Sequence, residues 1–128
     1  MTTEPLKPKR KKASKSPTQR SLAWLRKLGY TVAIVERWNA FAKIRQDLYG
    51  FVDLLAIGSG SIVAIQATAG AVAHRLQKIS DEPNSRVWLE SGGLIEVHGW
   101  TKRADGKYHM RRVKVYLDCG AVCSQEFE

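Results

Sequence analysis

Two short apolar runs near the middle of the chain, residues 51–57 and 62–67, predict two neighbouring β-strands. Both runs are rich in Val, Ile and Leu, and the four residues between them, 58–61, read Gly-Ser-Gly-Ser. This composition is typical of a tight turn between two strands. The pattern therefore predicts a β-hairpin in the centre of the chain.

The predicted hairpin contains three polar residues, Asp53, Gln66 and Thr68. Gln66 and Thr68 point to the same face, because side chains alternate along a strand with a period of two. Asp53 lies among apolar neighbours, where an ionised carboxylate is costly to bury without a cation, a metal or several donors. Asp53 is thus either a metal ligand or one half of a structural ion pair.

Helical spacing of apolar residues recurs at both sides of this hairpin. Ser16 and Pro17 suit a helix start, and Gly29 suits its end, so residues 17–28 are expected to form a helix. A basic-faced helix is expected over 72–79 and a short one over 83–90. Strands are expected over 30–36, 94–100 and 108–117, and a loop over 37–49.

These elements predict the order α-β-β-β-α-(α)-β-β, which is an α/β fold with a mixed central sheet flanked by helices. At 128 residues the chain has the length of one domain. We expect the domain to span residues 17–118, after a disordered basic arm of residues 1–16 and before a C-terminal tail of residues 119–128.

Charge points to an anionic partner. The formal net charge is +9 and the sequence pI is about 9.8, values that favour nucleic acid as the partner. Residues 1–20 hold +6 of this charge, so the rest of the chain is only mildly basic. The run PKRKK resembles a nuclear localisation signal and equally a phosphate-binding tail.

The sequence shows no feature of a membrane or secreted protein. It has neither an apolar run of about 20 residues nor an N-terminal apolar h-region, so we expect no membrane association and a cytoplasmic location. Cys119 and Cys123 could join His98 and His109 in a zinc site, but the spacing fits no usual ligand pattern. Reduced thiols are the simpler interpretation.

Two short motifs carry a resemblance to a known family. Gly50-Phe51-Val52-Asp53 opens one predicted strand and Gln66-Ala67-Thr68 closes the next. With the order of elements, these motifs resemble the core of the PD-(D/E)XK nuclease superfamily, which includes restriction endonucleases, Holliday junction resolvases and VRR-NUC domains. The chain is similar to small phage and prophage proteins of that type, which implies a bacterial or phage-infected cell.

The resemblance implies a site that binds Mg²⁺ or Mn²⁺. By position, Asp53 matches the family's Asp, Gln66 the second acid and Thr68 the lysine, and Glu36 could supply a further acid. The implied metal ligands are Asp53, Glu36, Gln66 and the backbone carbonyl of Ala67. Gln66 and Thr68 depart from the family pattern, because neither carries a charge.

Other charged residues could compensate for these departures. Lys43, Arg45 or Arg75 could bring a cation to the site, and Asp47 could add a carboxylate. Glu36 is equally readable as a surface acid, and Asp47 as a residue that caps a turn.

The implied function is a metal-dependent endonuclease that hydrolyses DNA phosphodiester bonds, and selectivity for branched DNA is left open. Two alternatives stay open: a nuclease-like fold that binds nucleic acid without cutting it, and a protein-interaction module with a basic tail. Self-association into a homodimer is open as well. The residues expected to contact nucleic acid are Lys43, Arg45, His74, Arg75, Lys78, Lys9, Arg10, Lys11 and Lys12.

Overall fold

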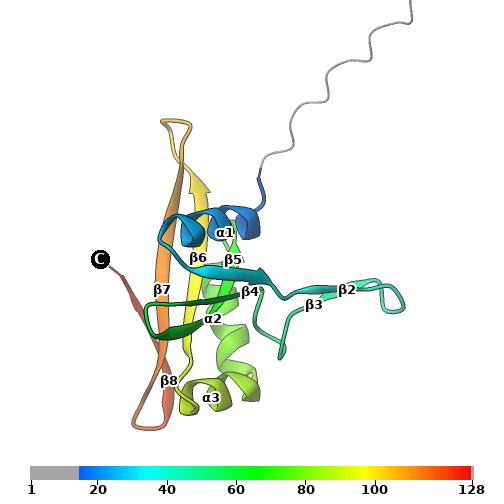
Figure 1. The fold of residues 1–128 in the computed structure, drawn as a ribbon, viewed down its shortest axis with the longest axis vertical. Helices are drawn as coiled ribbons and strands as arrows, with labels where there is room; N and C mark the ends of the chain where they lie inside the picture. Colours follow the sequence, from blue (N-terminus) through cyan, green and yellow to red (C-terminus); the bar gives the residue numbers. More distant parts are fainter. Residues whose placement is uncertain (1–14, 128) are drawn as a thin grey trace, which may run out of the picture.

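The computed structural model describes residues 15–127 and shows an α/β domain with a mixed sheet (Figure 1). The fold class expected from the sequence is thereby confirmed. No helix in this part of the chain has both the length and the apolar character that crossing a membrane requires. The elements are α1 (Pro17–Lys27), β1 (Thr31–Ile34), β2 (Arg37–Asn39), β3 (Ile44–Gln46), β4 (Leu54–Gly58), β5 (Ser61–Thr68), α2 (Val72–Asp81), α3 (Pro83–Glu90), β6 (Leu94–Lys102), β7 (Tyr108–Asp118) and β8 (Ala121–Glu126).

The main sheet has six strands in the order β1-β4-β5-β6-β7-β8. Strands β5 and β6 run parallel, and the other neighbouring pairs of this sheet run antiparallel. A parallel pair needs a crossover connection, which α2 and α3 provide here. The predicted central hairpin is confirmed as β4 and β5, joined at Ser59 and Gly60, whose φ angles of 52° and 74° suit a type I′ turn.

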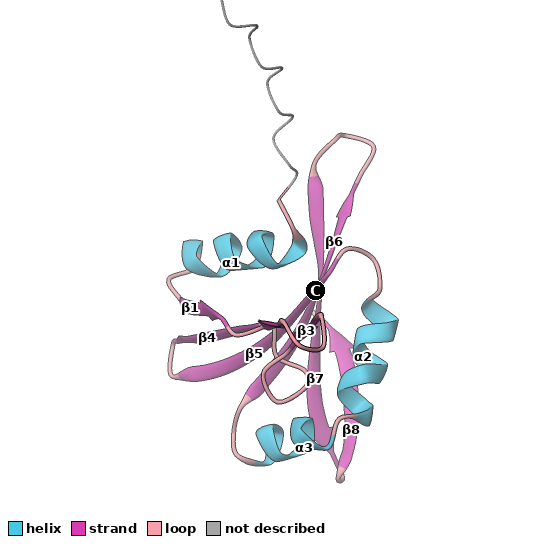
Figure 2. Cartoon of the chain, turned by 90° about the vertical axis from the view of Figure 1, so that its right-hand side faces the viewer, coloured by secondary structure: helices cyan, strands magenta, loops and turns pink. Residues whose placement is uncertain are grey.

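Helices pack on both faces of the sheet (Figure 2). Leu22 and Leu25 of α1 pack with residues of β1, β4 and β5 in one core cluster. On the opposite face, α2 and α3 pack against the strands, and Val72 and Ile79 of α2 are buried there. Because β5 contributes alternate residues to the two clusters, it is covered on both faces and runs through the centre of the domain.

Three expectations need correction. Residues 37–49 are not simply a loop, because β2 and β3 pair there as a separate two-stranded sheet. Residues 119–128 are not simply a tail, because β8 pairs with the last predicted strand through a turn at Cys119 and Gly120. The strands β2, β3 and β8 are largely exposed, so they lack the alternating burial that marks a strand in sequence. Asp53 also lies just before β4 rather than within it.

Candidate functional site

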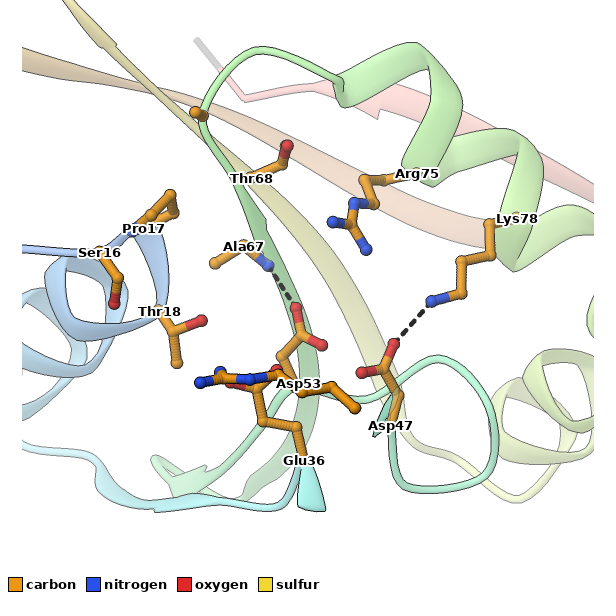
Figure 3. A pocket seen from close by; sticks show the side chains of 12 residues that line it. Ser16, Pro17, Thr18, Glu36, Asp47, Asp53, Ala67, Thr68, Arg75 and Lys78 are labelled. Carbon is orange, nitrogen blue, oxygen red and sulfur yellow. Dashed lines mark hydrogen bonds and ion pairs between the residues drawn. The ribbon is translucent and has the colours of Figure 1, made fainter. Parts of the chain in front are cut away.

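Three carboxylates from different parts of the chain meet at one end of the sheet. Glu36 lies between β1 and β2, Asp47 directly follows β3, and Asp53 directly precedes β4. One carboxylate oxygen of each residue lies within 4.8 Å of the others. Figure 3 shows the three acids along the lower side of a pocket, with α2 across from them. The acids at positions 36 and 53 were expected here from the sequence, and Asp47 was an open alternative.

Asp53 is the buried member of this acidic group, with 3% of its surface exposed. Its Oδ2 accepts a hydrogen bond of 3.1 Å from the backbone N–H of Ala67. Burial, together with the hydrogen bond and the charge of Asp47, nevertheless raises the pKa of Asp53 to about 7. Near neutral pH the Asp53 carboxyl therefore exchanges between a protonated and an ionised form.

Asp47 behaves in the opposite way. Burial opposes its ionisation, but hydrogen bonds with Asp53, Lys78 and Gln66, together with the charge of Lys78, outweigh burial and lower the pKa of Asp47. Asp47 is thus the charged partner of a protonated Asp53. Two neighbouring carboxyls with pKa values pushed apart are a recurrent property of catalytic and metal-binding sites.

Cations surround the acidic group. Arg45 Nη1 lies 2.7 Å from Glu36 Oε1, and Lys78 Nζ lies 2.7 Å from Asp47 Oδ2. Arg75, one turn before Lys78 on α2, donates from Nη1 to Gln66 Oε1 across 3.3 Å. Its Nε is buried and has no hydrogen-bond partner among the described residues. Of the three cations expected to compensate for the missing lysine, Arg45 and Arg75 reach the site.

Lys43 and His74 lie elsewhere. Lys43 is in the turn between β2 and β3, and His74 is exposed on α2, and neither lines the pocket described below. Lys78, expected only as a nucleic-acid contact, supplies the cation at Asp47 instead. The sequence contained a signal for this role of Lys78: Arg75 and Lys78 are three residues apart on one helix, which places both on the same face. The predicted contacts Lys9, Arg10, Lys11 and Lys12 lie outside the described residues.

Gln66 turns its amide nitrogen toward the acidic group. Nε2 donates to Asp47 Oδ2 across 2.8 Å and to the carbonyl oxygen of Phe51 across 2.6 Å, while Oε1 accepts from Arg75. The reverse orientation would place the amide oxygen against two acceptors and the amide nitrogen against a donor. Gln66 is therefore a hydrogen-bond donor here, and the predicted metal-ligand role would require its amide to turn over.

Thr68 and Ala67 complete the β5 side of the site. The hydroxyl oxygen of Thr68 accepts a hydrogen bond of 3.2 Å from the backbone N–H of Ala71, the residue before α2. Thr68 thus holds the start of α2 and brings no charge to the place where the family has a lysine. Ala67 binds Asp53 through its N–H, and both residues line the pocket.

The pocket above these residues has a volume of about 500 Å³. Acids line one side, Arg75 and Lys78 reach in from α2, and the first turn of α1 closes a third side (Figure 3). The N-terminus of a helix carries a partial positive charge, which adds to that of the two cations. The pocket thus has an acidic wall that suits a cation and a positive rim that suits a phosphate.

The donor set of the acidic wall fits Mg²⁺ or Mn²⁺. Both are hard cations that prefer carboxylate oxygens, and Glu36, Asp47 and Asp53 offer three such groups. Within residues 15–127, this is the one place where three side chains that can bind a metal lie close together. The predicted zinc alternative finds no support in this part of the chain, because both ring nitrogens of His98 are engaged by Ser21 and Glu96.

Comparisons with known proteins add no family to this description. No protein-family model matches the chain, and no curated protein matches it.

Proposed function

We propose that this protein is a Mg²⁺- or Mn²⁺-dependent endonuclease that hydrolyses DNA phosphodiester bonds. The observation that carries the proposal is the acidic group Glu36, Asp47 and Asp53, which faces the cations of α2 across one pocket. Without the separate hairpin β2–β3 and the short helix α3, the order α1, β1, β4, β5, α2, β6 also agrees with the α-β-β-β-α-β order that the resemblance to PD-(D/E)XK nucleases implies.

The three carboxylates would hold the metal, which when bound supplies charge neutralisation and a more acidic water. Asp53 must lose its proton to act as a ligand, and a pKa of about 7 makes this loss easy near neutral pH. The protonated form also limits repulsion among the three acids while no cation is present. Loss or gain of one proton on Asp53 would therefore set the net charge of the site with and without the metal.

The cations of α2 would orient the phosphodiester. Arg75 and Lys78 line the pocket opposite the acids, and the start of α1 adds its N-terminal partial charge. Positive groups fixed at a phosphate stabilise the negative charge that develops there during hydrolysis. Lys78 would in this way replace the lysine that the family pattern places where Thr68 stands.

One observation favours the alternative in which the protein binds nucleic acid without cutting it. Each of the three acids already has a hydrogen-bond or ion-pair partner within the protein. Arg45 binds Glu36, Lys78 and Gln66 bind Asp47, and the N–H of Ala67 binds Asp53. A site that is satisfied in this way stays folded without a metal. It could then present its positive rim to nucleic acid while its acids serve only the fold.

A cleavage assay separates the two functions. The full-length protein would be incubated with supercoiled plasmid, linear duplex, single strands and a four-way junction, in Mg²⁺, Mn²⁺ or EDTA. We expect cleavage that requires the metal and is lost in Asp53→Asn, while Asp105→Asn, at an exposed position in the turn before β7, cuts normally. Cleavage by Asp53→Asn would contradict the site, and binding without any cleavage would support the alternative.

A further inference from the structure

The hairpin of β2 and β3, residues 37–46, stands away from the main sheet (Figure 1). It pairs as a separate two-stranded sheet, with Trp38 opposite Arg45. Its two ends are the acids of the candidate site, since Glu36 precedes it and Asp47 follows it. The hairpin is therefore an extension of the site and not a remote appendage.

Aromatic rings and positive charges dominate the surface of this hairpin. Trp38 is 63% exposed, and Phe41 at the tip is fully exposed. Arg37, Lys43 and Arg45 lie in the same ten residues, which contain no acid. Large exposed rings are unfavourable in water, so their position on a projecting hairpin indicates a binding surface.

The tip holds a defined conformation. Oδ1 of Asn39 accepts hydrogen bonds of 3.0 Å from the backbone N–H groups of both Phe41 and Ala42. Lys43 then adopts a left-handed conformation, with φ of 53°, where the chain turns back into β3. These contacts fix the backbone of the tip, which lowers the entropic cost of ordering it on binding.

A second pocket joins the hairpin to the acidic group. It has a volume of about 300 Å³, and Ile34, Trp38 and Gln19 line it together with four residues shared with the first pocket. The four shared residues are Ser16, Thr18, Glu36 and Arg45. A bound strand could therefore run from the acidic group past Arg45 to the ring of Trp38 without leaving this surface.

We propose that the hairpin of residues 37–46 binds an unpaired stretch of DNA, with Trp38 and Phe41 stacking on bases and Arg37 and Lys43 contacting phosphates. This inference rests on the proposed function for the choice of DNA, and it adds the class of substrate: DNA with unpaired bases next to the cleavage site. Alternating rings and cations fit a single strand, whose bases expose their faces and whose backbone is anionic.

Duplex DNA fits the hairpin less well. A β-ribbon that reads a major groove uses polar side chains against base edges. Here two well-exposed side chains are rings, and Arg45, the polar residue opposite Trp38, pairs with Glu36. Bases inside a duplex are already stacked on each other and cannot accept these rings.

The test measures binding in EDTA, so that it does not depend on catalysis. Fluorescence anisotropy would follow the full-length protein on a labelled single strand and on a duplex of the same length and label, at one salt concentration. Trp38→Leu and Phe41→Leu keep apolar surface but remove the ring, whereas Trp38→Phe and Phe41→Tyr keep a ring. Val87→Ala, at an exposed apolar position on α3, is the control for loss of apolar surface elsewhere.

We expect each leucine variant to lose about 10-fold in single-strand affinity, because base stacking on one ring contributes that much. The ring-keeping variants and Val87→Ala should stay within about 2-fold of wild type, and duplex affinity should hardly change in any variant. Single-strand binding should also quench tryptophan fluorescence in wild type and much less in Trp38→Phe.

Two outcomes would overturn the inference. One is an equal loss of affinity for single strand and duplex, and the other is full binding by both leucine variants, which would assign the exposed surface to a lipid or protein partner instead. Failure of the proposed function gives a different result, because the preference for single strands would then persist in EDTA while no metal supports cleavage.

Discussion

The side-chain amide of Gln66 donates a hydrogen bond to the carboxylate of Asp47, with 2.8 Å between Nε2 and Oδ2. The same nitrogen donates to the carbonyl oxygen of Phe51. A neutral residue of β5 therefore holds both ends of the segment between Asp47 and Phe51 in place. In the absence of a metal, Gln66 supports the acidic group as a donor, which a carboxylate at this position could not do.

Gln66→Glu should destabilise the metal-free protein and strengthen its response to metal. The oxygen that replaces Nε2 would face Asp47 Oδ2 and the Phe51 carbonyl in a fully buried position, while the other oxygen keeps its contact with Arg75. We expect a cost of about 2–4 kcal/mol in unfolding free energy. Mn²⁺ should recover most of this loss, because the variant offers a fourth carboxylate. Urea unfolding in EDTA and in Mn²⁺ measures both effects.

The control for this substitution is Gln125→Glu at an exposed position on β8, which should change neither stability nor the Mn²⁺ response. Equal stability of Gln66→Glu and wild type in EDTA would show that the Gln66 amide does not face the acidic group.

The unfolding free energy should fall as the pH rises from about 4 to about 7. The pKa of Asp53 is raised from 3.8 to about 7 in the folded protein, so the folded state binds more protons than the unfolded state in this window. Linkage then gives a loss of up to ~4 kcal/mol, which levels off above pH 7. Urea unfolding of wild type and Asp53→Asn should show this slope in wild type and its absence in the variant.

The same proton should compete with the metal. Mn²⁺ affinity should rise about 10-fold per pH unit below pH 7 and level off above it, because binding requires the ionised Asp53. Calorimetric titrations at pH 5.5, 6.5 and 7.5 measure this, and a pH-independent affinity would exclude Asp53 as a ligand.

Lys78→Met should separate metal binding from cleavage. Lys78 lies 2.7 Å from Asp47, so its removal should tighten Mn²⁺ binding, since a competing cation is lost. The cleavage rate should nevertheless fall at least ~10-fold, because the phosphate loses a fixed positive group. Calorimetry and initial rates of plasmid nicking measure the two effects in the same preparations.

Lys78→Arg is the matched variant, because it keeps the charge with a different geometry. Its rate should lie between those of wild type and Lys78→Met. A Lys78→Met protein that cuts at the wild-type rate would show that Lys78 serves only the ion pair with Asp47.

Arg112→Met should cost about 3 kcal/mol in unfolding free energy at pH 7. Arg112 donates to both oxygens of the buried Glu96, with distances of 2.6 and 2.8 Å. Breaking a buried pair leaves an uncompensated charge. The neighbouring Arg111 pairs with Glu126 at the surface, so Arg111→Met should cost less than ~1 kcal/mol.

This stabilisation should also vanish in acid. Despite burial, hydrogen bonds with Arg112 and His98 lower the pKa of Glu96 to about 2, so the contribution of Glu96 is complete above pH 4.5 and is lost as the pH falls toward 2. Thermal unfolding of Glu96→Gln and wild type between pH 7 and pH 2 should show a difference in melting temperature that shrinks as the pH falls. A constant difference would exclude the ionised pair as its source.

Removal of residues 1–14 should lower the salt dependence of DNA binding. This segment contains Lys7, Lys9, Arg10, Lys11 and Lys12, and each cation that contacts a phosphate adds about 0.7–0.9 to the slope of log K against log salt. With all five in contact, we expect the slope to fall by about 3.5 to 4.5, measured by anisotropy between 50 and 300 mM salt. An unchanged slope would show that these residues do not contact phosphates.

The sequence by itself determined most of the secondary structure. The helix over 17–28, the hairpin around Gly58 and Gly60, the crossover helices and the strands over 94–100 and 108–117 all follow from apolar periodicity and turn residues. These signals are local: each depends on residues within one element or one turn. Asp53 could be identified in the same way, because a carboxylate between apolar neighbours stands out without any knowledge of its partners.

Only the tertiary structure decided which groups meet. Asp47 and Lys78 are 31 residues apart and come from a turn and a helix, so no spacing rule joins them. The strands β2, β3 and β8 bury one face too weakly for the sequence to show a strand pattern. The orientation of the Gln66 amide depends on Asp47, Phe51 and Arg75 together, because an amide offers a donor and an acceptor and its surroundings select between them.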